Sequence, residues 1–222
     1  SSSLQYESFI NEIKENNGAT NLNFRHSLAL QAFSEIAYYD SVISNYLNSQ
    51  ANLKFTLKKT FHGNLNENLR YGENPHQNAS FYSINQDQDI VQLNGKKLSY
   101  NNYNDIFSAL SISSMLKKNI GSSIVKHTNP CGVSSEKNHL KSFENALKCD
   151  PISAFGGIVS CNYKINKKLA YKLNKKFFEI IIAKGFNDDA LKILKNKKNL
   201  RLIDSSKYNN QTKLDPVFHN NS

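Results

Sequence analysis

The 222-residue sequence contains no tryptophan, one methionine and three cysteines. An odd set of thiols, Cys131, Cys149 and Cys161, supplies neither a disulfide framework nor the paired Cys-x-x-Cys motifs of a zinc site. No segment approaches the roughly 18 consecutive apolar residues that a membrane span requires, and the first residues lack the character of a signal peptide. We therefore expect a soluble, unexported protein of the reducing cytoplasm.

Acidic residues are scarce relative to basic ones. The chain has 18 Asp and Glu against 28 Lys and Arg, a net charge of +10 and a pI near 9.4. Such an excess favours polyanionic partners, either nucleic acids or phosphorylated metabolites. Much of it is lysine in Asn- and Ile-rich runs such as residues 192–199, a bias that an AT-rich genome produces without selection for a basic face. The sequence also lacks the aromatic strings and zinc knuckles of RNA-binding modules.

The first fifty residues predict helix. Apolar residues recur every three to five positions from Phe24 to Leu47, with Thr20 or Asn21 available as the N-cap. After Gln50 the pattern changes to alternation over residues 53–58, which predicts a strand with one solvent-facing side and the start of a new unit.

The remainder alternates between short apolar runs and helical segments. Strands are expected at residues 79–84, 122–126, 157–161, 178–183 and 200–203, and helices at residues 104–118, 137–148, 166–174 and 188–195. This alternation predicts an α/β fold with a parallel or mixed sheet. Ligands of open α/β sheets bind at the carboxyl ends of strands, which directs attention to the loops at residues 70–77, 93–102, 126–132 and 150–157.

The pair Lys126 and His127 follows an apolar run and precedes Asn129-Pro130, which we expect to force a turn. These side chains suit an acyl or formyl transfer, since a neutral imidazole accepts the proton of an attacking amine while an ammonium stabilises the oxyanion. The neighbouring cation favours the neutral imidazole. A surface lysine beside a structural histidine is the alternative explanation.

Two other loops contain residues suited to a ligand. Arg70 offers a guanidinium for a phosphate and Tyr71 an aromatic face for a flat ring, although a turn with an exposed arginine also explains the pair. Phe155 and Gly156 belong to a glycine-rich segment whose backbone N–H groups could approach a ligand, but the spacing of a phosphate loop with its lysine is missing.

Two further motifs favour structure over chemistry. Asn94-Gly95 is the strongest two-residue hairpin signal and predicts a turn. Pro130-Cys131 resembles part of a zinc-deaminase motif, yet no second thiol follows at the required spacing. We therefore expect no metal site.

In order and wording, the segments at residues 69–77, 98–102, 125–132 and 150–157 closely resemble the formyltransferase domain of a known family. This is the PurH family of bifunctional purine-biosynthesis enzymes, which join AICAR formyltransferase to IMP cyclohydrolase. The helical start is similar to the family's connector between its two domains. The resemblance extends from about Leu4 to Asp204.

The resemblance implies a cytidine-deaminase-like, three-layer α/β subdomain with a mixed sheet, preceded by a helical connector. Residues 1–50 would be the connector, residues 51–204 the first half of the formyltransferase domain, and residues 205–222 a polar tail. The cyclohydrolase domain and the second half of the formyltransferase region are missing, so the chain resembles an internal fragment. We expect weak binding and slow or absent turnover from it alone.

The family's chemistry implies roles for specific residues. His127 would deprotonate the 5-amino group of AICAR and Lys126 would stabilise the oxyanion, with the formyl group supplied by 10-formyltetrahydrofolate and no zinc involved. The other implied substrate-binding residues are Arg70, Tyr71, Asn94, Gly95, Phe155, Gly156 and Glu179.

The expected partners are the AICAR ribotide, the folate and a second copy of the chain, because family active sites form across a homodimer. Cyclohydrolase activity would belong to the longer parent protein. Two alternatives stay open, a basic nucleic-acid-binding module and a catalytically inactive dimerisation fragment.

Overall fold

The computed structural model describes residues 2–51, 55–84 and 90–208. The chain divides into two compact units, residues 1–64 with 82–85 and residues 65–81 with 86–222, which we describe separately. No helix in the described part of the chain is both long and apolar enough to cross a lipid bilayer.

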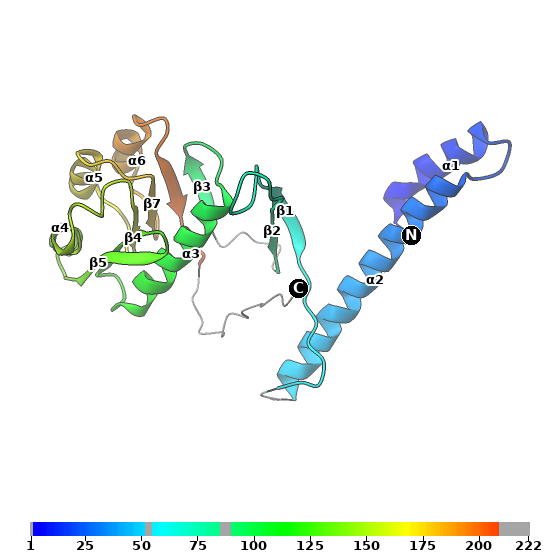
Figure 1. Ribbon diagram of the computed structural model, residues 1–222, viewed down its shortest axis with the longest axis horizontal. Coiled ribbons are helices and arrows are strands. Elements are labelled where there is room, and N and C mark those ends of the chain that lie inside the picture. Colours follow the sequence, from blue (N-terminus) through cyan, green and yellow to red (C-terminus); the bar gives the residue numbers. More distant parts are fainter. Residues whose placement is uncertain (1, 52–54, 85–89, 209–222) are drawn as a thin grey trace. The chain divides into compact units, whose positions relative to one another are not determined.

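The first unit is a helical hairpin (Figure 1). A short 3-10 turn, η1 (Ser3–Gln5), leads into α1 (Tyr6–Glu15), and α2 (Leu22–Gln50) follows. The helices are separated at Asn17 and Gly18, whose φ angles of 53° and 87° end the first helix. The predicted N-cap is confirmed, because the Asn21 side chain accepts a hydrogen bond of 2.8 Å from the Phe24 N–H.

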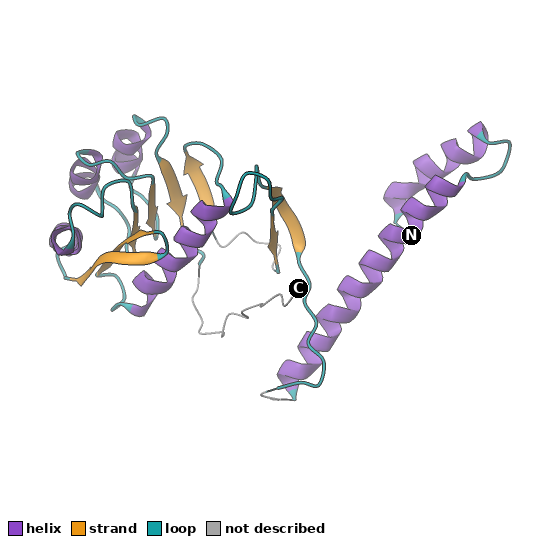
Figure 2. Cartoon of the chain, in the orientation of Figure 1, coloured by secondary structure: helices purple, strands orange, loops and turns teal. Residues whose placement is uncertain are grey.

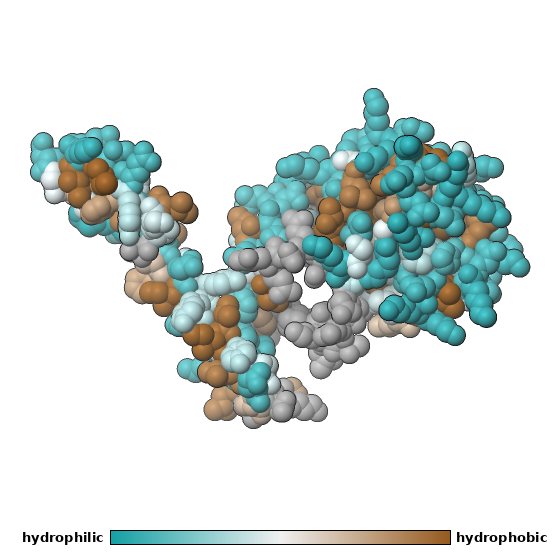
Figure 3. Space-filling view, turned by 180° about the vertical axis from the view of Figure 1, so that it is seen from behind, coloured by the Kyte–Doolittle hydropathy of each residue, from teal (hydrophilic) through white to brown (hydrophobic). Residues whose placement is uncertain are grey.

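Most of α2 is exposed within this unit, and its only buried residue is Ser41. Several apolar side chains of α2 are exposed, among them Phe33 with 73% of its surface. Figure 3 shows brown, hydrophobic patches on the helical unit. Near its end, Asn45 donates hydrogen bonds to Thr60, and Ser41 contacts the His62 ring.

The strand expected over residues 53–58 is wrong where it can be checked. Residues 52–54 lie outside the described part of the chain, and residues 55–58 form no strand. Phe55 and Leu57 are exposed, at 84% and 107%. Alternation alone therefore did not produce a strand over residues 55–58, because strand formation depends on packing and cross-strand context as well as on the local pattern.

The second unit contains a six-stranded sheet, and its mixed character was predicted (Figure 2). Its order is β3-β8-β7-β6-β4-β5, with β6, β7 and β8 parallel and the other pairs antiparallel. The strands are β3 (Val91–Asn94), β4 (Gly121–Lys126), β5 (Asn129–Ser135), β6 (Ile158–Cys161), β7 (Ile180–Ala183) and β8 (Arg201–Asp204). Two further strands, β1 (Asn64–Asn68) and β2 (Ser80–Ser83), form a separate two-stranded sheet. The strand expected at residues 79–84 lies outside the six-stranded sheet, whereas β3 and β5 were not expected.

Helices cover both faces of the six-stranded sheet. They are α3 (Tyr100–Met115), α4 (His139–Cys149), α5 (Lys167–Asn174) and α6 (Asp188–Lys195). Along β7, Ile180 and Ile182 pack with α3, whereas Ile181 and Ala183 pack with the other helices. The strand is buried on both faces, which explains its unbroken apolar run. The result is a three-layer α/β/α unit, whose likeness to cytidine deaminases stays a prediction.

Several boundaries differ from the predicted ones. Helix α3 begins at Tyr100 because Ser99 and Asn102 form a reciprocal capping box. Asn129-Pro130 does not form the expected turn but opens β5, and the turn lies at His127 and Thr128.

The predicted assignment of residues 51–204 to half of a formyltransferase domain stays a prediction. The predicted polar tail begins with an ordered contact, because Ser205 N–H donates to the Ala183 carbonyl at 2.8 Å. Residues 209–222 lie outside the described part of the chain.

Candidate functional site: a basic pocket at the end of β4

A pocket of about 1190 Å³ lies entirely within the second unit. Lys126 reaches it from the carboxyl end of β4, whereas Ile158 and Arg201 reach it from the amino ends of β6 and β8. The expectation of a crevice at carboxyl ends is therefore correct for β4 and for β3, whose carboxyl end leads into Lys96 and Lys97, and wrong for β6 and β8. Because β4 runs antiparallel to β6, the carboxyl end of one strand meets the amino end of the other.

Six of the nine residues singled out from the sequence line this pocket. They are Arg70, Tyr71, Lys126, His127, Gly156 and Glu179. The other three, Asn94, Gly95 and Phe155, are not among its lining residues.

Lys126 and His127 lie at the turn of the β4–β5 hairpin. Lys126 pairs with Asn129 across the β4–β5 hairpin, leaving His127 and Thr128 as its two central residues. Their φ angles of 51° and 61° are both positive, as two-residue hairpins with a type I′ turn require. The histidine and threonine are exposed, and the lysine is half-buried. This geometry presents two adjacent polar side chains at the rim of the pocket.

The lysine is also attached to the glycine-rich loop. Its Nζ donates a hydrogen bond of 3.0 Å to the Phe155 carbonyl oxygen. Gly156, with φ of 74°, donates its N–H to the Phe177 carbonyl, and Gly157 donates to Ala154. These N–H groups are used within the protein, so the loop lacks the free amides that a phosphate-binding loop offers.

Arg70 and Tyr71 reach the pocket from the loop between β1 and β2. The guanidinium carbon lies 5.1 Å from the centre of the Tyr71 ring, a cation–π arrangement. Strands β1 and β2, which flank this loop, contact α3 at Tyr103. The Tyr103 ring stacks on Phe81 of β2 with 4.5 Å between the ring centres, and its hydroxyl donates a hydrogen bond of 3.2 Å to the Glu67 carboxylate of β1. Burial, and then the Glu67 carboxylate, raise the pKa of Tyr103 well above its usual range, so the phenol stays a donor.

Asn94 and Gly95 contact the segment before β8 and have structural roles. The Asn94 amide donates to the Lys197 and Leu200 carbonyls at 3.2 and 2.7 Å. A Cβ added at Gly95 would meet the Leu200 carbonyl oxygen at 2.7 Å. Asn94 ends β3, and this strand pairs with the distant β8 instead of forming a hairpin with a sequence neighbour.

The pairing of β3 with β8 also places at the pocket three basic residues that were not predicted as site residues. Lys96, Lys97 and Arg201 line the pocket, and the Arg201 Nε atom donates to the Lys96 carbonyl at 3.1 Å. With Arg70 and Lys126, five basic side chains line the pocket. Lys96 and Lys97 lie in the loop at residues 93–102, which the sequence already indicated. Arg201 reaches the pocket because β8 pairs with β3.

Acidic and amide groups complete the lining. The acidic members are Glu67, Glu73, Asp105 and Glu179, and the first turn of α3 contributes Ser99, Asn101 and Asn102. Asn102 donates a long hydrogen bond of 3.5 Å to Glu179. The pocket therefore offers cations for an anionic group together with donors and acceptors for a polar ring.

The neighbouring thiol is not activated. Burial and Asp150 raise the pKa of Cys131, and the lowering effect of Lys126 is smaller. In residues 2–51, 55–84 and 90–208, no three His, Cys, Asp or Glu side chains are grouped so that they could hold a metal ion.

Comparisons with known proteins identify the class to which this α/β unit and its pocket belong. The family model described as AICARFT/IMPCHase bienzyme matches residues 1–219. The chain therefore belongs to this family.

Curated relatives carry the description bifunctional purine biosynthesis protein PurH. The protein of Leptospira biflexa is 45% identical over 204 residues, covering 91% of this chain and 40% of the relative. The Prochlorococcus marinus protein is 41% identical over 214 residues, covering 91% and 41%. That of Clostridium botulinum is 42% identical over 202 residues, covering 89% and 40%. The chain thus spans about two-fifths of the length of these relatives.

Proposed function

We propose that this chain forms part of an AICAR formyltransferase of de novo purine biosynthesis. The observation that carries the proposal is the meeting of Arg70-Tyr71 and Lys126-His127 in one basic pocket. The two pairs are far apart in the sequence, and each lies in a segment that resembles the family's formyltransferase domain. An enzyme that binds a ribotide needs cations for its phosphate beside groups that act on its amine.

In the proposed reaction, His127 accepts a proton from the 5-amino group of AICAR as the nitrogen attacks the formyl carbon of 10-formyltetrahydrofolate. Lys126 stabilises the oxyanion of the tetrahedral intermediate. The bond from the formyl carbon to the folate nitrogen then breaks, and that nitrogen receives the proton. The products are FAICAR and tetrahydrofolate.

The ribotide phosphate would interact with the cations of the pocket. Arg70 suits it because a guanidinium forms two parallel hydrogen bonds to phosphate oxygens. Arg70 lies over one face of the Tyr71 ring, and we propose that the base of AICAR stacks on the other. The Glu179 carboxylate would accept a hydrogen bond from the carboxamide of AICAR, and the Asn102 amide would donate one to it.

We propose that the remaining folate and nucleotide contacts come from the part of the family's sequence that this chain does not span. They would be supplied across a homodimer, in the cytoplasm. The three cysteines are free, which fits a reducing compartment. Cyclohydrolase activity would belong to the longer protein.

Thermal unfolding with and without AICAR tests this proposal. A ligand that binds only the folded state stabilises it by about 2.7 kcal/mol at a hundredfold excess over Kd. We expect stabilisation of the wild type and no shift for Arg70→Ala, whereas Lys126→Ala should keep most of the shift because its ammonium acts on the oxyanion. Lys175→Ala, at an exposed position outside the pocket, is the matched control and should respond like the wild type.

Salt separates the proposal from nucleic-acid binding. Binding to a phosphate backbone weakens steeply with ionic strength because counterions are released. A pocket closing on one ribotide should depend on salt much less. No AICAR-dependent shift, together with strongly salt-dependent binding of a DNA or RNA oligonucleotide, would contradict the proposal.

A further inference from the structure

The turn that carries His127 is built from unfavourable residues. Positive φ at both central positions is the conformation for which hairpins select Asn-Gly or Gly-Gly. Here the positions hold His127 and Thr128, at 51° and 61°. A β-branched residue at positive φ is a steric outlier, so contacts elsewhere must hold the turn.

Those contacts come from one face of α3. The Asp105 Oδ1 atom accepts a hydrogen bond of 2.7 Å from the Thr128 N–H, and the Ser108 Oγ donates one of 2.7 Å to the Thr128 carbonyl. Asp105 and Ser108 are three residues apart and therefore neighbours on the helix surface. Both backbone groups of Thr128 are thus held by the same helix.

The helix is itself fixed to the sheet. Ile106 and Ala109, beside the two contacting residues, are fully buried in the core beneath α3. The side-chain hydrogen bonds from Thr128 Oγ1 and Asn129 to the His127 carbonyl stay within the hairpin. The Lys126 Nζ bond to the Phe155 carbonyl reaches the glycine-rich loop but holds neither backbone group of Thr128.

We infer that Asp105 is a positioning residue, whose carboxylate holds the His127–Thr128 turn so that Lys126 and His127 face the pocket. The inference rests on the proposed function for its catalytic consequence. An ionised acceptor suits this task because hydrogen bonds to charged groups are shorter and stronger than neutral ones. Asp105 acts on the reaction through the placement of its neighbours.

Two variants and a matched control test the inference. Asp105→Ala removes the acceptor, Asp105→Asn keeps a neutral oxygen in place, and Asp189→Ala removes an exposed aspartate of α6 outside the pocket. By NMR, Asp105→Ala should speed hydrogen exchange of the Thr128 amide about tenfold or more, as expected from loss of a hydrogen bond to a charged group. Asp105→Asn should restore much of the protection, and Asp189→Ala should leave it unchanged.

Formyl-transfer kinetics provide the second readout. In Asp105→Ala we expect kcat to fall about 100-fold, the effect of misplacing a reacting group by roughly 1 Å. KM for AICAR and the unfolding midpoint should change little, and Asp105→Asn should recover much of the rate. A purely structural role would instead lower the midpoint in parallel with the rate.

The two readouts separate failure of the inference from failure of the proposed function. If the wild type transfers formyl and Asp105→Ala does so equally well, the positioning role is overturned and the proposed function stands. If the wild-type chain transfers none, the exchange measurement alone decides. Unchanged Thr128 exchange in Asp105→Ala overturns the inference, and accelerated exchange confined to residues 126–129 supports it.

Discussion

Lys126 Nζ donates a hydrogen bond to the carbonyl oxygen of Phe155, 29 positions later in the chain, at 3.0 Å. This contact joins the end of β4 to the glycine-rich loop before β6. The ammonium is thereby directed to a carbonyl oxygen, which has a partial negative charge and not a full one. A developing oxyanion would compete well for the same donor, because a full negative charge attracts the ammonium more strongly than the partial charge of a carbonyl oxygen does.

Replacing Lys126 by methionine should therefore slow formyl transfer more than it weakens binding. Methionine keeps an unbranched stem but provides no donor. Loss of one oxyanion donor lowers kcat by about 100- to 1000-fold. Steady-state kinetics check this, with Lys175→Met as the surface control. An unchanged kcat would assign the oxyanion to another group.

His127→Asn should separate folding from chemistry. Asparagine tolerates positive φ better than most residues, so the turn and the urea midpoint should be preserved. The rate should fall about 100- to 10,000-fold because the general base is lost. His127→Val is the contrasting variant, and its β-branch should destabilise the protein by about 1–2 kcal/mol. Equal urea midpoints for His127→Asn and His127→Val would contradict the claim that positive φ at this position strains the turn.

Gly132→Ala should severely destabilise the second unit. A Cβ at this position would lie 1.9 Å from the Ala146 carbonyl oxygen, where β5 crosses α4. Because the colliding atom is backbone, the helix itself must move, and we expect a loss of about 3 kcal/mol or more. Urea unfolding measures it. Ser135→Ala, at the exposed end of the same strand, should have little effect.

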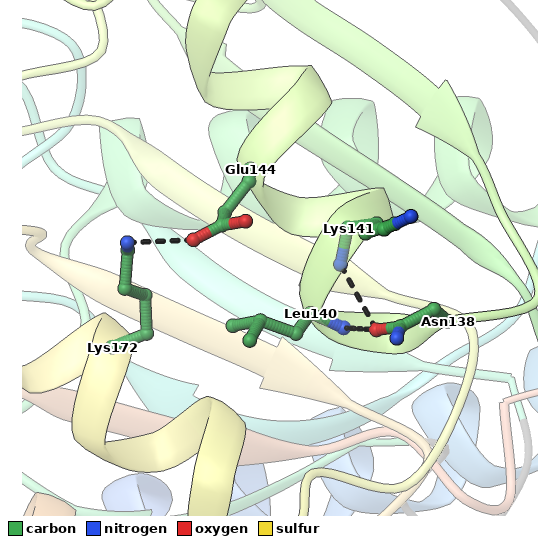
Figure 4. Close-up of polar contacts among 5 residues, drawn as sticks. All are labelled: Asn138, Leu140, Lys141, Glu144 and Lys172. Carbon is green, nitrogen blue, oxygen red and sulfur yellow. Dashed lines mark hydrogen bonds and ion pairs between the residues drawn. The ribbon is translucent and has the colours of Figure 1, made fainter.

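Asn138 caps α4, as Figure 4 shows. Its Oδ1 accepts from the Leu140 and Lys141 N–H groups at 3.0 and 3.2 Å. Asn138→Ala should cost about 1 kcal/mol of unfolding free energy, whereas Asn138→Asp retains an acceptor and should cost little. A loss of equal size in both variants would show that the cap is not the cause.

The pair Glu144 and Lys172 predicts a pH effect (Figure 4). The hydrogen bond from Lys172, 2.6 Å long, holds the pKa of the Glu144 carboxyl below its ordinary value. A carboxyl with a depressed folded-state pKa stabilises the fold above its unfolded pKa, and this contribution disappears as pH falls through the folded pKa. The difference in stability between wild type and Glu144→Gln should therefore shrink on acidification from pH 7.

High salt tests the same pair independently. Both side chains are partly exposed, so salt should screen the attraction and reduce the difference at neutral pH. Urea unfolding across pH and NaCl concentration measures both effects. A difference that grows as the pH falls would contradict the assigned sign.

Local pattern was enough for the elements whose residues face a single environment. The helices at residues 166–174 and 188–195 and the apolar core of β7 followed from periodicity and capping residues, because these signals depend on neighbours in sequence. The motifs around Arg70 and Lys126 were legible for a similar reason, since unusual polar residues stood beside turn-forming ones.

Tertiary structure decided the rest. Strand β5 contains Pro130 and Gly132, which disfavour a strand locally, and it exists because β4 supplies its hydrogen-bond partners. Arg201 reaches the pocket, and Asn94 does not, because β3 pairs with a strand about 110 residues later. The sequence by itself determined which residue types are available for the chemistry. Only long-range strand pairing and the face of α3 bearing Asp105 decided which of them meet, because hydrogen bonds between distant segments leave no local pattern in the chain.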